Sequence, residues 1–178
     1  MKKTFVILCL VFFSSVQAYA QAGDFYGGLQ GGYITYYKAP LYGCNLSYTI
    51  FGPLQISLTG LMNPNVNKPA AYNKDVMEKL KLYSANLDAR LFLINMESWA
   101  TGPSLGVQYL HKGKTTFLTD GREESYADNL LGFNIGWHLK VNVTDNFRVN
   151  GGWRYSSIKD DDSYNLFYVG IGYAFNLL

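Results

Sequence analysis

The sequence from Leu130 to Val143 reads Leu-Leu-Gly-Phe-Asn-Ile-Gly-Trp-His-Leu-Lys-Val-Asn-Val. From Phe133 onward, large apolar residues alternate strictly with glycine or polar residues. A period of two is typical of a β-strand whose two faces meet different surroundings. In a soluble sheet the polar face meets water, whereas in a transmembrane barrel the apolar face meets lipid and the polar face lines the interior. The alternation predicts a strand, and its orientation depends on the rest of the chain.

The N-terminus has the three parts of an export signal. Lys2 and Lys3 supply the positive start, residues 5–13 are apolar, and Ala18-Tyr19-Ala20 offers small residues where signal peptidase cleaves. We expect residues 1–20 to be a signal peptide that is removed, which leaves residues 21–178 as one outer-membrane domain. The apolar run is too short to anchor the chain across a bilayer as a helix.

The overall composition does not reveal a membrane protein, so any membrane-spanning character must lie in alternating strands rather than in long apolar runs. Hydrophobic residues make up 48% of the 178 residues, yet no run of about 20 apolar residues follows the signal peptide. Without Lys2 and Lys3, 13 basic residues balance 13 acidic ones, so no basic excess points to nucleic acid. Cys44 is the only cysteine after residue 20, which excludes a disulfide within that region.

Eight stretches of the mature chain carry strand-like patterns. Their connections broadly alternate between tight turns, such as Thr144-Asp145, and longer polar links, such as residues 63–78 and 113–125. This alternation is typical of a barrel with short periplasmic turns and longer outer loops. The sequence thus predicts an all-β fold, an antiparallel eight-stranded up-and-down transmembrane β-barrel with both termini at the periplasmic rim. The predicted strands are 24–37, 41–50, 53–62, 79–94, 98–112, 126–143, 146–158 and 163–177.

The apolar and polar faces agree from strand to strand. In the register that turns the apolar residues to lipid, no charge lies in the middle of the lipid face, where Arg or Lys costs about 2–4 kcal/mol. The main alternative is a soluble lipocalin-like barrel, whose large apolar residues point inward. The two alternatives send Phe133, Ile135, Trp137 and Leu139 in opposite directions.

Aromatic residues give an independent indication of two membrane interfaces. Most tyrosines fall toward the outer ends of the predicted strands, and Phe25, Phe51, Trp99, Phe147 and Phe175 fall toward the inner ends, as in aromatic girdles. Tyrosine is also a good strand former, which is the alternative reason for its abundance. The tyrosines predicted at the outer rim are Tyr33, Tyr36, Tyr37, Tyr42, Tyr109, Tyr126, Tyr155 and Tyr164.

With these features the mature chain resembles the small eight-stranded outer-membrane barrels typified by OmpX and the membrane domain of OmpA. The resemblance rests on the strand spacing and on the closing strand Asn165-Leu-Phe-Tyr-Val-Gly-Ile-Gly-Tyr-Ala-Phe175. It implies a Gram-negative-type outer membrane, contact with outer-membrane lipid and lipopolysaccharide, and insertion by the barrel-insertion machinery. Members often end in an aromatic residue that this machinery recognises, whereas this chain ends in Leu178. We expect a monomer that binds no nucleic acid.

Charged and ionisable residues on the inward face form the candidate functional set. An eight-stranded barrel has room inside only for side chains or one small ligand, and a buried charge without a partner costs several kcal/mol. We expect a network centred on Asp88, with Arg90, Lys140 and Arg148, to close the lumen. A narrow anion-preferring pore stays open as an alternative, because basic residues outnumber acidic ones there. The set is Asp88, Arg90, His138, Lys140, Arg148 and Arg154.

The sequence contains no clear catalytic, metal or cofactor pattern. Outer-membrane lipid A deacylases place a histidine two residues before a serine on one strand face, which neither His111 nor His138 does. A serine and a histidine can still meet across strands, so a lipid-modifying enzyme remains the alternative function. Two histidines predicted at opposite ends of a barrel do not suit a metal site. The sequence predicts a non-enzymatic protein with an envelope-integrity or surface-interaction role and no cofactor.

Overall fold

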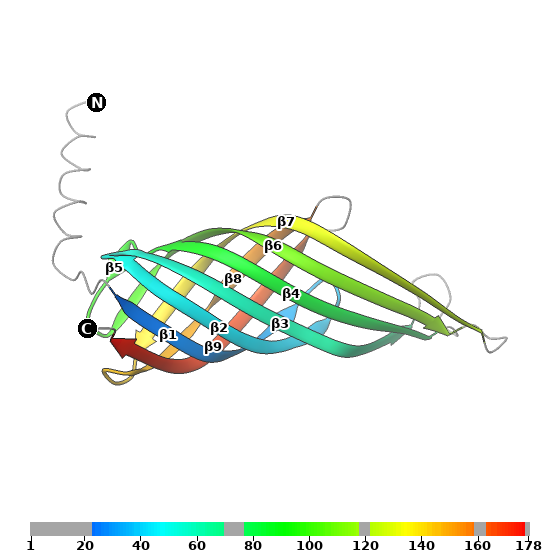
Figure 1. The fold of residues 1–178 in the computed structure, drawn as a ribbon, viewed down its shortest axis with the longest axis horizontal. Helices are drawn as coiled ribbons and strands as arrows, with labels where there is room; N and C mark the ends of the chain where they lie inside the picture. Colours follow the sequence, from blue (N-terminus) through cyan, green and yellow to red (C-terminus); the bar gives the residue numbers. More distant parts are fainter. Residues whose placement is uncertain (1–22, 70–76, 118–121, 159–162, 177–178) are drawn as a thin grey trace, which may run out of the picture.

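The computed structural model describes residues 23–69, 77–117, 122–158 and 163–176, which form one closed antiparallel barrel (Figure 1). The predicted signal peptide lies outside the described residues. Eight long strands make the wall, and β5 is a two-residue pairing onto β6. The strands are β1 (Asp24–Ile34), β2 (Ala39–Phe51), β3 (Leu54–Pro69), β4 (Met77–Leu91), β5 (Ile94–Asn95), β6 (Trp99–Phe117), β7 (Glu123–Asn142), β8 (Phe147–Ile158) and β9 (Tyr164–Asn176).

The long strands pair in an up-and-down order. Each pairs with its neighbours along the chain, β4 pairs directly with β6, and β1 pairs with β9, which closes the barrel. The turn between β2 and β3 is tight and contains Gly52. The φ of Gly52 is 39°, a conformation that glycine adopts without a steric penalty. The structure confirms the predicted eight-stranded antiparallel barrel.

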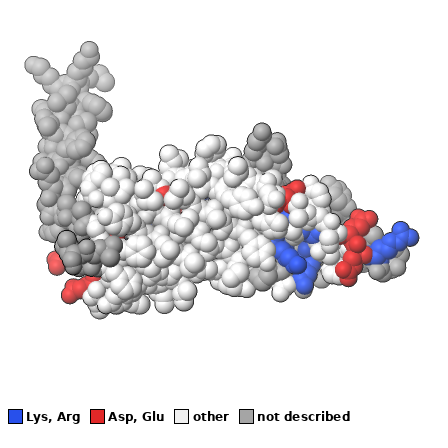
Figure 2. Space-filling view, viewed as in Figure 1, with Lys and Arg blue, Asp and Glu red and all other residues white. Residues whose placement is uncertain are grey.

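The large apolar residues of β7 point away from the interior. Phe133, Ile135, Trp137 and Leu139 are 72%, 54%, 47% and 41% exposed, while Asn134 and His138 between them are buried. The soluble lipocalin-like alternative required the opposite orientation and is wrong. Figure 2 shows the same character on the face over β3 and β4, where a broad middle zone has only a small patch of acidic surface and no basic side chains.

The two ends of the barrel differ. β1 begins and β9 ends at one end, here called the terminal rim, where the β2–β3, β4–β6 and β7–β8 connections also lie (Figure 1). At the other end, the distal rim, the β3–β4 and β6–β7 hairpins extend the wall beyond the remaining strands. Figure 2 shows most of the visible lysine and arginine side chains gathered on this extension.

Some predicted boundaries were wrong, mainly at the distal rim. Residues expected in long loops continue the strands instead, because β3 reaches Pro69, β4 starts at Met77, and β6 and β7 pair from Trp99↔Val141 out to Phe117↔Glu123. The first strand ends earlier than expected, at Ile34, and residues 35–38 make the turn to β2. Polar strand residues resemble loop residues in sequence, because no buried face imposes alternation on them.

Within the described residues no helix is long and apolar enough to cross a membrane.

Candidate functional site

Every second side chain of each strand points into the barrel, and the character of these side chains changes along its axis. From the terminal rim, β1 contributes Asp24, Tyr26 and Gln30 before ending in Ile34. β2, β4, β7 and β8 broadly follow the same order, with polar residues toward the terminal rim and apolar residues toward the distal rim, whereas β9 presents only glycine and alanine toward the terminal rim. The interior thus has a polar layer and, beyond it, an apolar layer.

All six residues of the predicted charge set lie on the inward face of their strands, in the polar layer. Asp88, Arg90, His138, Arg148 and Arg154 are only 1–4% exposed. The sixth, Lys140, is half-buried nearer the terminal rim and lies with its ammonium nitrogen 5.0 Å from the ring centre of Phe92.

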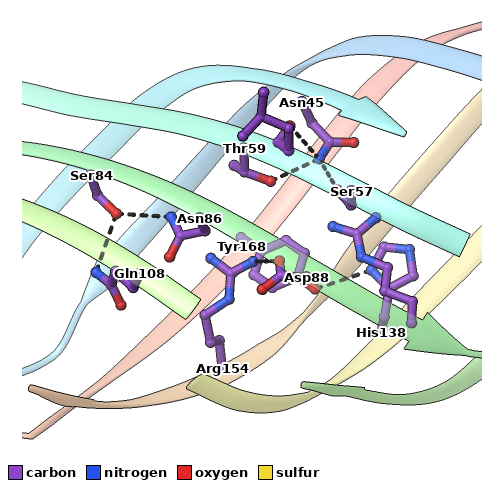
Figure 3. Close-up of polar contacts among 12 residues, drawn as sticks. Asn45, Ser57, Thr59, Ser84, Asn86, Asp88, Gln108, His138, Arg154 and Tyr168 are labelled. Atoms are coloured by element: carbon purple, nitrogen blue, oxygen red, sulfur yellow. Dashed lines mark hydrogen bonds and ion pairs between the residues drawn. The ribbon is translucent and has the colours of Figure 1, made fainter. Parts of the chain in front are cut away.

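The ion pairs differ from the expected network centred on Asp88. Asp88 pairs with Arg154, and Arg148 pairs with Asp24 at 2.7 Å (Figure 3 for the first pair). Arg90 instead donates from Nη1 to Gln55 Oε1 at 3.3 Å. Among the described residues Asp88 forms no ion pair with Arg90, Lys140 or Arg148, so these direct pairs were predicted wrongly, because the stagger between strands decides which inward side chains meet. The charge of Asp88 still acts electrostatically on Arg90.

Asp24 is the acidic residue that the sequence reasoning missed. It is buried and lies on the inward face of β1, two residues before the inward Tyr26. Asp24 is separated from Tyr26 and Gln30 by an even number of positions, which indicates the same face of a strand. The glycines of this segment weaken the alternation and obscured this indication. With Asp24 included, the interior of the described barrel holds two carboxylates against Arg90, Lys140, Arg148 and Arg154.

Neutral side chains bond to one another around these ions. The Asn45 amide donates to Ser57 Oγ at 2.6 Å and to Thr59 Oγ1 at 2.8 Å (Figure 3). On the opposite side of the close-up, Ser84 Oγ accepts hydrogen bonds from Asn86 and Gln108. The bonds of Asn45 and Gln108 bridge neighbouring strands, the bond of Asn86 lies within β4, and together these side chains fill the polar layer.

The distal half of the interior is packed with apolar side chains, which the sequence reasoning did not foresee. This distal apolar cluster brings together residues of β1, β2, β3, β4, β6, β8 and β9 with Tyr37 of the β1–β2 turn. It corrects the girdle prediction for Tyr37 and Tyr164, which are buried inside rather than placed at the membrane surface. The cluster consists of Ile34, Tyr37, Ala39, Leu41, Leu61, Leu80, Leu82, Leu110, Ile158, Tyr164, Leu166 and Tyr168.

Tyr168 connects the two layers. Its ring belongs to the distal apolar cluster, and its hydroxyl oxygen lies 3.0 Å from His138 Nδ1 (Figure 3). The Arg154 guanidinium lies 5.5 Å from the centre of the same ring, within reach of a cation–π interaction. The ion pair of Arg154 with Asp88 is thereby covered on its distal side.

The histidines do not form the pairs that acyl transfer requires. His111 Nδ1 lies 2.8 Å from Asn129 Oδ1 on the outer surface, and the partner of His138 is the Tyr168 phenol. Among the described residues, neither ring is hydrogen-bonded to a serine or threonine hydroxyl that would serve as a nucleophile. The same described part of the chain contains no cluster of three histidine, cysteine, aspartate or glutamate side chains suited to a metal ion.

A polar cavity opens the barrel at the terminal rim. It has a volume of about 620 Å³, and Lys140 and Arg148 line it together with Glu97 and Asp145 of the rim connections. Asp24, the ion-pair partner of Arg148, also lines it, so three acidic and two basic residues of the described chain face this cavity.

Comparison with known proteins supports an outer-membrane assignment. The family model described as outer membrane protein beta-barrel domain matches residues 5–175. No curated protein sequence matches the chain.

Solved barrels superpose on most of the chain. The N-terminal β-barrel domain of Pseudomonas aeruginosa OprF is 17% identical with a TM-score of 0.60, over 88% of this chain and 100% of that one. Ail, the attachment invasion locus protein of Yersinia pestis, is 21% identical with a TM-score of 0.57, over 86% and 99%. Neisserial surface protein A is 16% identical with a TM-score of 0.53, over 88% and 98%. The Yersinia protein has also been solved in complex with the heparin analogue sucrose octasulfate. Identities this low show a shared fold only.

Proposed function

The chain belongs to the outer membrane protein β-barrel domain family, and on this premise we propose that it is a non-enzymatic barrel serving envelope integrity or surface interaction. It is a protein of the Gram-negative outer membrane. The observation that carries the proposal is the filled interior, in which a hydrogen-bonded polar layer adjoins the distal apolar cluster. In the described part of the barrel, this filling leaves no through-channel, because the mouth cavity at the terminal rim adjoins the polar layer and the distal apolar cluster lies beyond it.

The distal rim is the part suited to contacts outside the cell. We orient the barrel with its terminal rim toward the periplasm, so that the β3–β4 and β6–β7 hairpins project from the outer leaflet of the membrane. They carry charged side chains on otherwise regular strands, including the exposed Lys81, Glu123 and Glu124. Hydrogen bonding of Tyr126 to Asp128, together with the carboxylate charge, raises the pKa of Tyr126 on the projecting strand.

The partners we propose follow from the surface. Outer-membrane lipid and lipopolysaccharide contact the largely uncharged middle zone, and the barrel-insertion machinery acts during biogenesis. The chain functions as a monomer, because a closed barrel leaves no long strand edge to pair with another copy. The balanced charge of the mature chain supports no role in binding nucleic acid.

The two roles can be separated with one variant. A two-residue Asn-Gly turn in place of residues 114–126 keeps the pairing of Gly113 with Ala127 and removes the tip of the β6–β7 hairpin. Cells lacking the protein are complemented with the intact chain or with this variant. We then measure uptake of a hydrophobic dye for envelope integrity and retention of cells on immobilised heparin for surface interaction.

An envelope role predicts that both chains reduce dye uptake equally, since the variant retains the part of the wall that all eight long strands share. A surface role predicts that only the intact chain is retained on heparin. Failure of the intact chain in both assays contradicts the proposal. The enzyme alternative has its own test: purified protein that releases fatty acid from lipopolysaccharide in detergent overturns the non-enzymatic assignment.

A further inference from the structure

A second, much smaller cavity lies deeper in the polar layer than the mouth at the terminal rim. It measures about 10 Å³, the space that one water-sized particle needs. It shares Lys140 and Arg148 with the mouth cavity, so the two adjoin. Its lining residues are Tyr26, Ser47, Gln55, Arg90, His138, Lys140, Arg148 and Asn150.

The lining of this inner cavity is strongly one-sided in charge. Three of the described lining residues, Arg90, Lys140 and Arg148, are basic, and none is acidic. Asp24 reaches Arg148 from outside the lining, and Asp88 is engaged by Arg154. Arg90 therefore has only the neutral acceptors Gln55 and Ser47 among its described hydrogen-bond partners.

Several donors at the inner cavity have no hydrogen-bond partner among the described residues. They are Nε and Nη2 of Arg90 and Nε and Nη1 of Arg148, on side chains that are 2% and 4% exposed. A buried cationic donor without an acceptor costs more than a neutral one, because desolvation of the charge is uncompensated. A small anion placed between them would supply both the missing charge and the missing acceptor.

We propose that the inner cavity is a binding site for one small monovalent anion of the chloride class, held between Arg90, Lys140 and Arg148. The ion enters from the terminal rim through the mouth cavity, which these last two residues also line. The distal apolar cluster blocks the other side, so the site is a closed end rather than a step in conduction. Chloride is larger than a water molecule, so the side chains of Arg90 and Lys140 must move apart slightly to admit it, whereas polyatomic anions such as sulfate or gluconate are far too large for the cavity.

The first experiment uses the intact chain in detergent micelles at constant ionic strength, with sodium chloride or bromide replacing sodium gluconate. An anion that binds only the folded barrel raises the unfolding midpoint until the site is saturated. We expect this rise in wild type, and we expect Arg90→Gln to weaken apparent chloride affinity about tenfold or more. Lys81→Gln is the matched control, because it removes a lysine from the outward face of the same strand and should leave the rise unchanged.

The second experiment does not depend on the stability of any variant. Wild-type crystals grown in bromide should show an anomalous peak inside the inner cavity, beside Arg90 and Arg148. The proposal is overturned if that peak is missing at saturating bromide. It is also overturned if gluconate raises the midpoint as much as chloride does, or if Arg90→Gln folds and keeps the full chloride response.

Discussion

Asp88 and Arg154 illustrate how much one buried pair contributes inside a narrow barrel. Both are almost fully buried, and each is the other's counter-charge. Asp88→Ala leaves the Arg154 guanidinium uncompensated, so we expect the free energy of unfolding to fall by about 3–5 kcal/mol. Urea unfolding of barrels folded into lipid vesicles measures this change.

The double variant Asp88→Ala with Arg154→Met, compared with Asp88→Ala and Arg154→Met alone, is the control for this pair. It removes both charges, so it should cost less than the sum of the two single changes, as expected for residues in direct contact. Additive costs would contradict a specific partnership. The pair of Asp24 with Arg148 should behave independently, because no described hydrogen bond joins the two ion pairs.

At the scale of a strand, β7 tests the position of the membrane. Ile135 lies on the outward face in the middle of β7, and Val143 lies on the same side just beyond its end. Ile135→Arg should destabilise the folded barrel in vesicles by about 2–4 kcal/mol, because the charge falls near the bilayer midplane. Val143→Arg is the control at the interface and should cost about 0–1 kcal/mol. Equal costs at the two positions would place the lipid zone elsewhere.

At the scale of the whole molecule, the distal apolar cluster decides whether solutes pass. Wild type should show little steady conductance in planar bilayers, since Leu82 and Leu110 are fully buried in a cluster that spans the distal interior. The double variant Leu82→Ala with Leu110→Ala removes volume there, and each such change costs about 2–5 kcal/mol in stability. We expect a small steady conductance, which current recordings would detect.

Leu58 and Leu87 provide the matched control for this conductance, because they are exposed on the outer face of the neighbouring strands β3 and β4. Replacing both by alanine should leave the interior packed, so we expect no increase in steady conductance across the bilayer. Large and stable wild-type channels would contradict the closed interior and favour the anion-preferring pore.

The alternation from Phe133 to Val143 was enough to predict the strand and its two faces, and the export signal and the recurrence of the pattern in the other strands predicted the lipid-facing side and the class of barrel. This succeeds because each strand side chain points to one of two faces, so a period of two is visible without knowing any neighbour. The inward position of Arg90, His138 and Arg154 follows from the same local rule.

Only the tertiary structure decided which inward side chains meet. Asp88 pairs with Arg154, 66 positions away along the chain, and not with Arg90 two residues on, because strand stagger and barrel closure set the contacts across the lumen. The distal apolar cluster escaped prediction for the same reason, since Leu41, Leu82 and Leu110 come from three strands and share a layer only once the barrel closes. The face of a strand on which a side chain lies is determined by the local sequence. Its position along the barrel axis and its contacts across the lumen are determined by the closed sheet.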